Sequence, residues 1–166
     1  MNTPDFIVEI FLQPGEFYWG DSDSRVRTIL GSCVALCLWH PKLKIGGMCH
    51  YLLASRAGEK PAGEKYDPRY GAEVMEMILH EIEKAKTKPR DYHVKIFGGG
   101  NMFANIQTDR VVKVGDKNVA LAEEFVSKYN FQVMGKHVKG EGHRSIALDL
   151  WSGNVWLKRP QTAEAK

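Results

Sequence analysis

Apolar and polar residues alternate, or apolar residues run together, in a series of short segments, and both patterns are typical of β-strands. Proline, glycine or clusters of small polar residues separate these segments. We therefore expect strands at residues 6–12, 17–19, 26–30, 34–39, 45–54, 92–97, 131–138, 146–150 and 155–157. The last two flank a short turn, which predicts a hairpin near the end of the chain.

Two other segments have apolar residues at helical spacing. The first covers residues 74–82 and is followed by lysines, where the helix dipole favours positive charge. The second covers residues 119–129, with Asp116 or Asn118 as its expected N-terminal cap. Strand content exceeds helix content, so the pattern predicts an α/β (α+β) domain rich in β-sheet, with two or three flanking helices.

The segment 56–70 combines glycine, proline and charged residues. This composition is typical of a mobile surface loop. We expect the loop to lie beside the hairpin that precedes it, and the pattern leaves open whether it closes over a substrate as a lid.

Length and composition narrow the class of protein. The 166 residues fit one domain, which we expect to span residues 1–160 and to be followed by a frayed tail at 161–166. Hydrophobic residues make up 43% and charged residues 26%, as in ordinary globular proteins. A net charge of +3 is too small for the basic surface of a nucleic-acid-binding protein. No apolar run is long enough to span a membrane and no signal peptide is evident, so we expect a soluble, cytoplasmic protein without membrane insertion.

The best candidates for chemistry are Cys33 and His50. The chain has three cysteines, an odd number, and a domain of this size needs no disulfide, so reduced thiols are expected. If the hairpin turns between residues 41 and 42, Cys33 falls directly opposite His50, with their Cβ atoms about 4.5–5.5 Å apart. The same register places Cys37 on the same face as Cys33, about 13 Å from it along the strand. Cys49 points to the other face.

Such a pair suits nucleophilic catalysis. A thiol attacks a carbonyl as the thiolate, and a neighbouring imidazole favours that form, so His50 is the expected partner of Cys33. The backbone amide of Cys33, with another donor from the tight turn at Gly31 and Ser32, is expected to stabilise the oxyanion of an attacked amide or ester.

A third group has to hold the imidazole ring of His50. Thr28, on the strand that enters the turn, is the nearest candidate, ahead of Ser32 and Asn101. The spacing also fits a simpler interpretation, in which Cys33 is a small buried apolar residue and His50 is structural.

Metal and nucleotide sites are disfavoured. The cysteines and histidines of this region lack the two-cluster spacing of a zinc site and would not converge on one ion. Gly98–Gly100 indicates a sharp turn at the end of a strand, because the Lys and Ser or Thr of a phosphate-binding loop are missing. We therefore expect neither a metal nor a cofactor.

At these residues the sequence resembles the CheD family, the chemoreceptor glutamine deamidases of bacterial chemotaxis. The similarity extends over nearly the whole chain. It is carried by LQPGEFYW at 12–19, TILGSCVALCLWHP at 28–41, IGGMCHYLL at 45–53, YGAEVMEMILHEI at 70–82, KIFGGGNMF at 95–103 and the region 144–159.

The resemblance implies a layered α/β sandwich in which Cys33 is the nucleophile, His50 the general base and acid, and Thr28 the third member of the site. Some members place the threonine one position earlier, where this chain has Arg27. The position before the histidine, often Asn in such proteins, is Cys49 here. The implied reaction is hydrolysis of a receptor glutamine amide to glutamate through a thioester.

The implied partner is the cytoplasmic domain of a chemoreceptor, and some family members also bind a CheC-type phosphatase. A monomer is expected by default. Two alternatives stay open from the sequence: a noncatalytic module that docks on receptors or on such a phosphatase, and an enzyme that uses the same pair on another acyl group, such as a receptor methyl ester or a transglutamination substrate.

Overall fold

The structure is a computed structural model that describes residues 3–102 and 109–159, so the tail expected at 161–166 lies outside the described residues. Strands predominate over helices, as the sequence predicts. The elements are β1 (Val8–Phe11), β2 (Phe17–Gly20), β3 (Ser24–Leu30), β4 (Val34–Trp39), β5 (Gly46–Tyr51), α1 (Gly71–Lys84), the short 3-10 helix η1 (Pro89–Asp91), β6 (His93–Gly98), α2 (Asp109–Lys128), β7 (Gln132–Val138), β8 (Arg144–Asp149) and β9 (Val155–Lys158).

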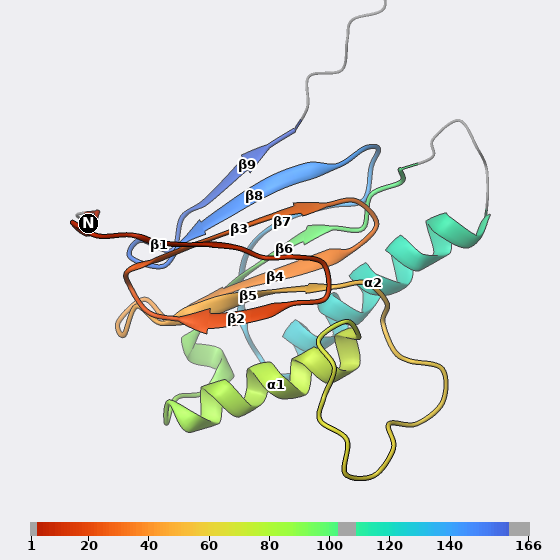
Figure 1. Cartoon of the computed structure of the whole chain (residues 1–166), viewed down its shortest axis with the longest axis horizontal. Helices are drawn as coiled ribbons and strands as arrows, with labels where there is room; N and C mark the ends of the chain where they lie inside the picture. Colours follow the sequence, from red (N-terminus) through yellow and green to blue (C-terminus); the bar gives the residue numbers. More distant parts are fainter. Residues whose placement is uncertain (1–2, 103–108, 160–166) are drawn as a thin grey trace, which may run out of the picture.

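The strands form two sheets, one on top of the other (Figure 1). A four-stranded sheet has the order β1-β3-β8-β9, and a five-stranded sheet has the order β2-β5-β4-β6-β7. The pairs β1/β3 and β6/β7 are parallel and the others are antiparallel, including the predicted terminal hairpin of β8 and β9. The helices α1 and α2 cover the outer face of the five-stranded sheet (Figure 1). This arrangement confirms the expected layered α/β (α+β) sandwich.

Successive side chains of β4 and β5 point to opposite faces of the five-stranded sheet, so the hydrophobic core has two halves. One half lies between the five-stranded sheet and the helices and includes Leu36, Cys49 and Val119. The other half lies between the two sheets and includes Cys37, Met48 and Val26. Every residue of β4 and β5 is buried because both faces of this hairpin are covered, which explains why its sequence is almost continuously apolar.

The predicted start of the second helix is wrong. Helix α2 begins at Asp109, so Asp116 and Asn118 lie inside it rather than at its N-terminus. The sequence misleads here because Gly115 resembles a helix stop. Within the helix it allows close contact with β6, since a Cβ atom at Gly115 would lie 2.9 Å from the carbonyl oxygen of Gly99.

The predicted register of the β4–β5 hairpin is also wrong, by two residues. His50 pairs with Ala35 rather than with Cys33, because the turn is centred one residue later than expected. The ring nitrogen Nδ1 of His40 accepts hydrogen bonds from the backbone amides of Lys42, at 3.2 Å, and Leu43, at 3.0 Å. These bonds stabilise the later turn. A shift of two residues keeps every side chain on its predicted face.

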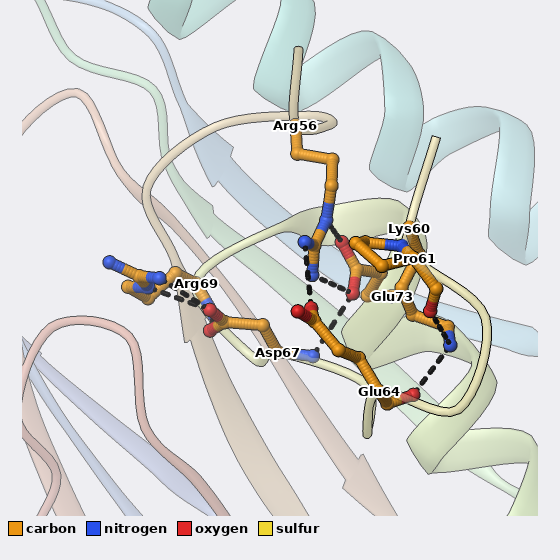
Figure 2. Close-up of polar contacts among 7 residues, drawn as sticks. All are labelled: Arg56, Lys60, Pro61, Glu64, Asp67, Arg69 and Glu73. Carbon is orange, nitrogen blue, oxygen red and sulfur yellow. Dashed lines mark hydrogen bonds and ion pairs between the residues drawn. The ribbon is translucent and has the colours of Figure 1, made fainter. Parts of the chain in front are cut away.

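Polar contacts tie the loop at 56–70 to the start of α1 (Figure 2). The guanidinium of Arg56 donates two hydrogen bonds of 2.7 Å to the carboxylate of Glu73, which also accepts one of 3.1 Å from the backbone amide of Asp67. Arg69 in turn donates to the carboxylate of Asp67. Both ends of the loop are therefore held on α1.

Candidate active site

The side chains of Thr28 and His50 meet between the two sheets. Thr28 lies on β3 and points inward between Val26 and Leu30, while His50 lies on β5 and points to the same interlayer space as Met48. The hydroxyl of Thr28 is 2.7 Å from Nδ1 of His50, and both residues are about 1% exposed. The third group expected on the strand entering the turn is therefore in contact with the ring.

A second hydrogen bond decides how the ring is protonated. The hydroxyl of Thr28 donates its only hydrogen to the carbonyl oxygen of Leu12, at 2.8 Å, because a carbonyl can only accept. The same hydroxyl must then accept from His50, so Nδ1 carries the ring hydrogen and the lone pair is on Nε2. Burial lowers the pKa of His50 to about 4, which keeps the ring neutral at neutral pH. A neutral imidazole with a free Nε2 is the form required of a general base.

Cys33 lies in the turn between β3 and β4, immediately before β4 begins. It is two residues from Ala35, the partner of His50, and packs against the same interlayer core as the other residues of that face. Diagonal neighbours of this kind are about 7–8 Å apart, a gap that a thiol and an imidazole ring can span. Cys33 is partly exposed. The candidate site therefore pairs a partly exposed thiol with a buried imidazole.

The Cys33 thiol and the His50 ring do not form a bonded pair at rest. Within the described residues, no hydrogen bond links Cys33 to His50, and burial raises the pKa of the Cys33 thiol above its ordinary value. The backbone amide of Cys33 acts in the opposite direction and favours the thiolate. The resting site thus holds a neutral thiol beside a neutral imidazole, and the proton has to move when substrate is present.

The glycines at 98–100 hold the turn that carries Cys33, a role that the sequence pattern did not reveal. The backbone amide of Gly99 donates to the carbonyl oxygen of Cys33, and that of Gly100 donates to the carbonyl oxygen of Gly31, both at 2.9 Å. Gly98 has a φ of +110°, and a Cβ atom there would overlap the carbonyl oxygen of Cys33. The strand-ending turn predicted here exists, and because glycines have no side chain, the end of β6 can approach the backbone of Cys33 closely.

The two other thiols are buried, so neither is open to a substrate. Cys37 is on the face of Cys33 but further along β4, and Cys49 is in the other half of the core. Burial raises the pKa of both thiols, that of Cys49 to about 12. Within residues 3–102 and 109–159, no group of three or more His, Cys, Asp or Glu side chains is placed to hold a metal ion.

Comparisons with known proteins agree on one family. A family model described as CheD chemotactic sensory transduction matches residues 52–159. A protein of Dechloromonas aromatica named "Probable chemoreceptor glutamine deamidase CheD 3" is 43% identical over 164 residues, which cover 99% of this chain and 95% of that protein. The chain belongs to the CheD family.

Two further members of the CheD family match at similar length. A "Probable chemoreceptor glutamine deamidase CheD" of Pseudomonas syringae pv. tomato is 44% identical over 159 residues, with 95% of this chain and 93% of that protein covered. A "Probable chemoreceptor glutamine deamidase CheD 1" of Leptospira interrogans is 33% identical over 163 residues, with 95% and 96% covered. The family model begins after Cys33 and His50, but the relatives extend the similarity over this region too. Among the described helices, none is long and apolar enough to cross a membrane.

Proposed function

We propose that this CheD family protein hydrolyses the side-chain amide of glutamine residues on chemoreceptors, leaving glutamate and ammonia. The observation that carries the proposal is the hydrogen bonding of His50, which uses Nδ1 on Thr28 and leaves Nε2 available as a base. Cys33 lies two residues from Ala35, the strand partner of His50. The names of the relatives supply the substrate class, because they are chemoreceptor glutamine deamidases.

The first half of the reaction forms a thioester. Nε2 of His50 takes the proton of the Cys33 thiol as the sulfur attacks the amide carbon, and a C–S bond forms while the carbonyl oxygen becomes an oxyanion. The backbone amide of Cys33, with a second donor from Gly31 and Ser32, stabilises that oxygen. The C–N bond then breaks, and His50 gives the proton to the departing ammonia.

The second half regenerates the thiol. Water loses a proton to His50 and attacks the thioester carbon, after which the C–S bond breaks and the proton returns to the sulfur of Cys33. Thr28 holds the ring through both halves, because its hydroxyl is itself fixed by the carbonyl of Leu12. The product is a glutamate side chain, so a neutral receptor position becomes a charged one.

We place the reaction in the cytoplasm, where reducing conditions keep a nucleophilic thiol available and where the receptor's signalling domain lies. The three cysteines of the structure are free, which fits this compartment. The monomeric state and a CheC-type phosphatase partner stay predictions from the sequence. Size-exclusion chromatography with light scattering, with and without such a phosphatase, tests both.

Mass spectrometry of a receptor cytoplasmic fragment tests the proposed function. Wild-type protein should convert specific glutamines to glutamates, and Cys33→Ala should convert none. Retained binding of the fragment without conversion by wild type would favour the noncatalytic module, and cleavage of receptor methyl esters with no change at glutamine would favour an esterase. Conversion by Cys33→Ala at the wild-type rate would exclude Cys33 as nucleophile.

A further inference from the structure

Asn118 joins helix α2 to the turn that carries the nucleophile. It lies in the helix interior and is completely buried. Its side-chain nitrogen Nδ2 donates to the carbonyl oxygen of Ser32, at 3.3 Å, and to that of Leu52, at 2.9 Å. The hydroxyl of Tyr51 donates to the backbone carbonyl of Asn118. One side chain therefore connects α2 with the residue before Cys33 and with the end of β5.

The bond to Ser32 sets the direction of the Cys33 amide. The described peptide bonds are all trans, and in a trans peptide the carbonyl and the following N–H point in opposite directions. Because the carbonyl of Ser32 points at Asn118, the N–H of Cys33 points away from α2. The partly exposed Cys33 side chain belongs to the same residue, and its own amide favours the thiolate. Asn118 thus orients the N–H that would bind the oxyanion by holding the other side of the same peptide.

The two ends of the Asn118 amide are used unequally. Its oxygen Oδ1 is buried and has no hydrogen-bond partner in the described part of the chain. An unsatisfied buried acceptor costs about 1–3 kcal/mol. The neighbouring helix positions that face the sheet, Val119 and Ala122, are apolar and fully packed. A polar side chain with one unpaired end is expected where its other end has a task that an apolar residue cannot perform.

We propose that Asn118 is a positioning residue for acyl transfer: it fixes the Ser32–Cys33 peptide so that the backbone N–H of Cys33 is preorganised for the oxyanion. This inference deepens the proposed function, since it concerns the same nucleophile. It concerns any acylation of Cys33, whatever the natural substrate. Asn118 does not touch the reacting atoms and acts only through the Ser32–Cys33 peptide.

Two reagents separate this role from a general effect on Cys33. Acylation by p-nitrophenyl acetate forms a C–S bond, passes through an oxyanion and releases p-nitrophenolate, so it needs the oriented amide. Alkylation by iodoacetamide forms a C–S bond and releases iodide with no oxyanion, so it reports only the thiol and its surroundings. Both rates are measured on the Cys33 peptide by mass spectrometry, with Cys33→Ala as the blank.

Asn118→Leu should lower the ratio of the acylation rate to the alkylation rate about 100-fold, the usual effect of losing one oxyanion donor, because a change in the thiolate fraction of Cys33 enters both rates alike. Asn118→Ser, which is smaller and polar, serves as the second variant should the leucine variant not fold. Val126→Ala is the matched control, because Val126 is buried on the same helix and its truncation destabilises α2 without touching the turn. This control should keep both rates near those of wild type.

Either of two results would overturn the proposal: acylation within threefold of wild type in a folded Asn118 variant, or acylation and alkylation falling together. Failure of the proposed function has a different signature. Wild-type Cys33 would then be acylated by the ester while receptor glutamines stay unconverted, and the comparison of Asn118 variants would still be decisive.

Discussion

The hydroxyl of Thr28 lies 2.7 Å from Nδ1 of His50 and 2.8 Å from the carbonyl oxygen of Leu12. One side chain of the four-stranded sheet thus fixes the protonation of a ring that belongs to the five-stranded sheet. The proposed catalytic geometry therefore depends on how the two sheets are stacked, because β3 and β5 belong to different sheets.

Replacing Thr28 with valine should remove the hydroxyl while keeping the shape of the side chain. The ring of His50 then loses its acceptor and Leu12 loses its donor, so we expect about a 100-fold loss of kcat for receptor deamidation. The free energy of unfolding should fall by about 1–3 kcal/mol, because two buried polar groups lose their partner. Steady-state ammonia release and urea denaturation measure the two effects.

Two controls separate Thr28 from its neighbour. Thr28→Ser keeps the hydroxyl and should retain most of the activity. Arg27→Ala changes the position where other family members have their threonine, but the side chain of Arg27 is 56% exposed, so the activity should stay near wild type. Activity lost in Arg27→Ala and kept in Thr28→Val would mean that the assignment of Thr28 is wrong.

Stability should fall as the pH drops from about 6.5 to about 4, partly because of His50. Over this window the unfolded chain takes up a proton on this residue while the folded protein keeps the buried ring neutral, so protonation favours unfolding. The largest effect is about 3 kcal/mol, at 1.36 kcal/mol for each unit of pKa difference.

The pH effect is measured as the difference between wild type and His50→Gln. Burial also lowers the pKa of His137, which acts in the same direction in both proteins and therefore cancels. The variant should show a shallower decline in unfolding free energy across pH 6.5 to 4. Equal slopes for the two proteins would mean that His50 is not held neutral by the fold.

Only one of the three thiols should react in the folded protein. Cys37 and Cys49 are buried with raised pKa values, while Cys33 is partly exposed. A colorimetric thiol reagent should therefore titrate one equivalent under native conditions and three after denaturation. Cys37→Ala and Cys49→Ala should keep deamidase activity, at a stability cost of about 1 kcal/mol for the lost sulfur.

The rate at which Cys33 is alkylated should depend on pH. Because burial raises its thiol pKa and no hydrogen bond to His50 is formed at rest, alkylation should speed up as the pH rises into the alkaline range. A plateau of high reactivity between pH 5 and 7 would indicate a preformed thiolate–imidazolium pair and would contradict this description of the resting site.

An added methyl group at Gly98 should disturb the nucleophile turn. Gly98→Ala forces a Cβ atom into the carbonyl oxygen of Cys33 at a φ of +110°, so both stability and activity should fall. Gly63→Ala is the matched control, since Gly63 has a φ of +85° but open space around it. It should cost about 1–2 kcal/mol through backbone strain and leave kcat unchanged. Equal kcat values in the two variants would argue against the bracing role of Gly98–Gly100.

The sequence predicted the fold well where burial dictates the pattern. The continuous apolar runs of β4 and β5 marked a hairpin covered on both faces, and its alternation correctly separated Cys49 from Cys37. The register was missed because it depends on a side chain: His40 binds two backbone amides and moves the turn by one residue. Neither composition nor turn propensity reveals these two hydrogen bonds.

The candidate site could be predicted from the sequence only in part, for a similar reason. Cys33, His50 and Thr28 stand out by residue type and spacing, whereas Asn118 is distant in the chain and inside a helix whose start was predicted too late. Only the packing of α2 against the end of β6, made possible by Gly99 and Gly115, brings Asn118 to the turn. Contacts between distant segments of this kind have no signature in local periodicity.

The central claim, a thioester between Cys33 and a receptor glutamine, is tested most directly by a rapid-quench experiment on the receptor cytoplasmic fragment. Acid-quenched samples of wild-type protein are digested and examined by mass spectrometry, and ammonia and new glutamate are measured in parallel. We predict a Cys33 peptide linked to a receptor peptide, with ammonia released before glutamate appears. Ammonia and glutamate that appear together, without any such adduct and with the same yield in Cys33→Ala, would contradict the account.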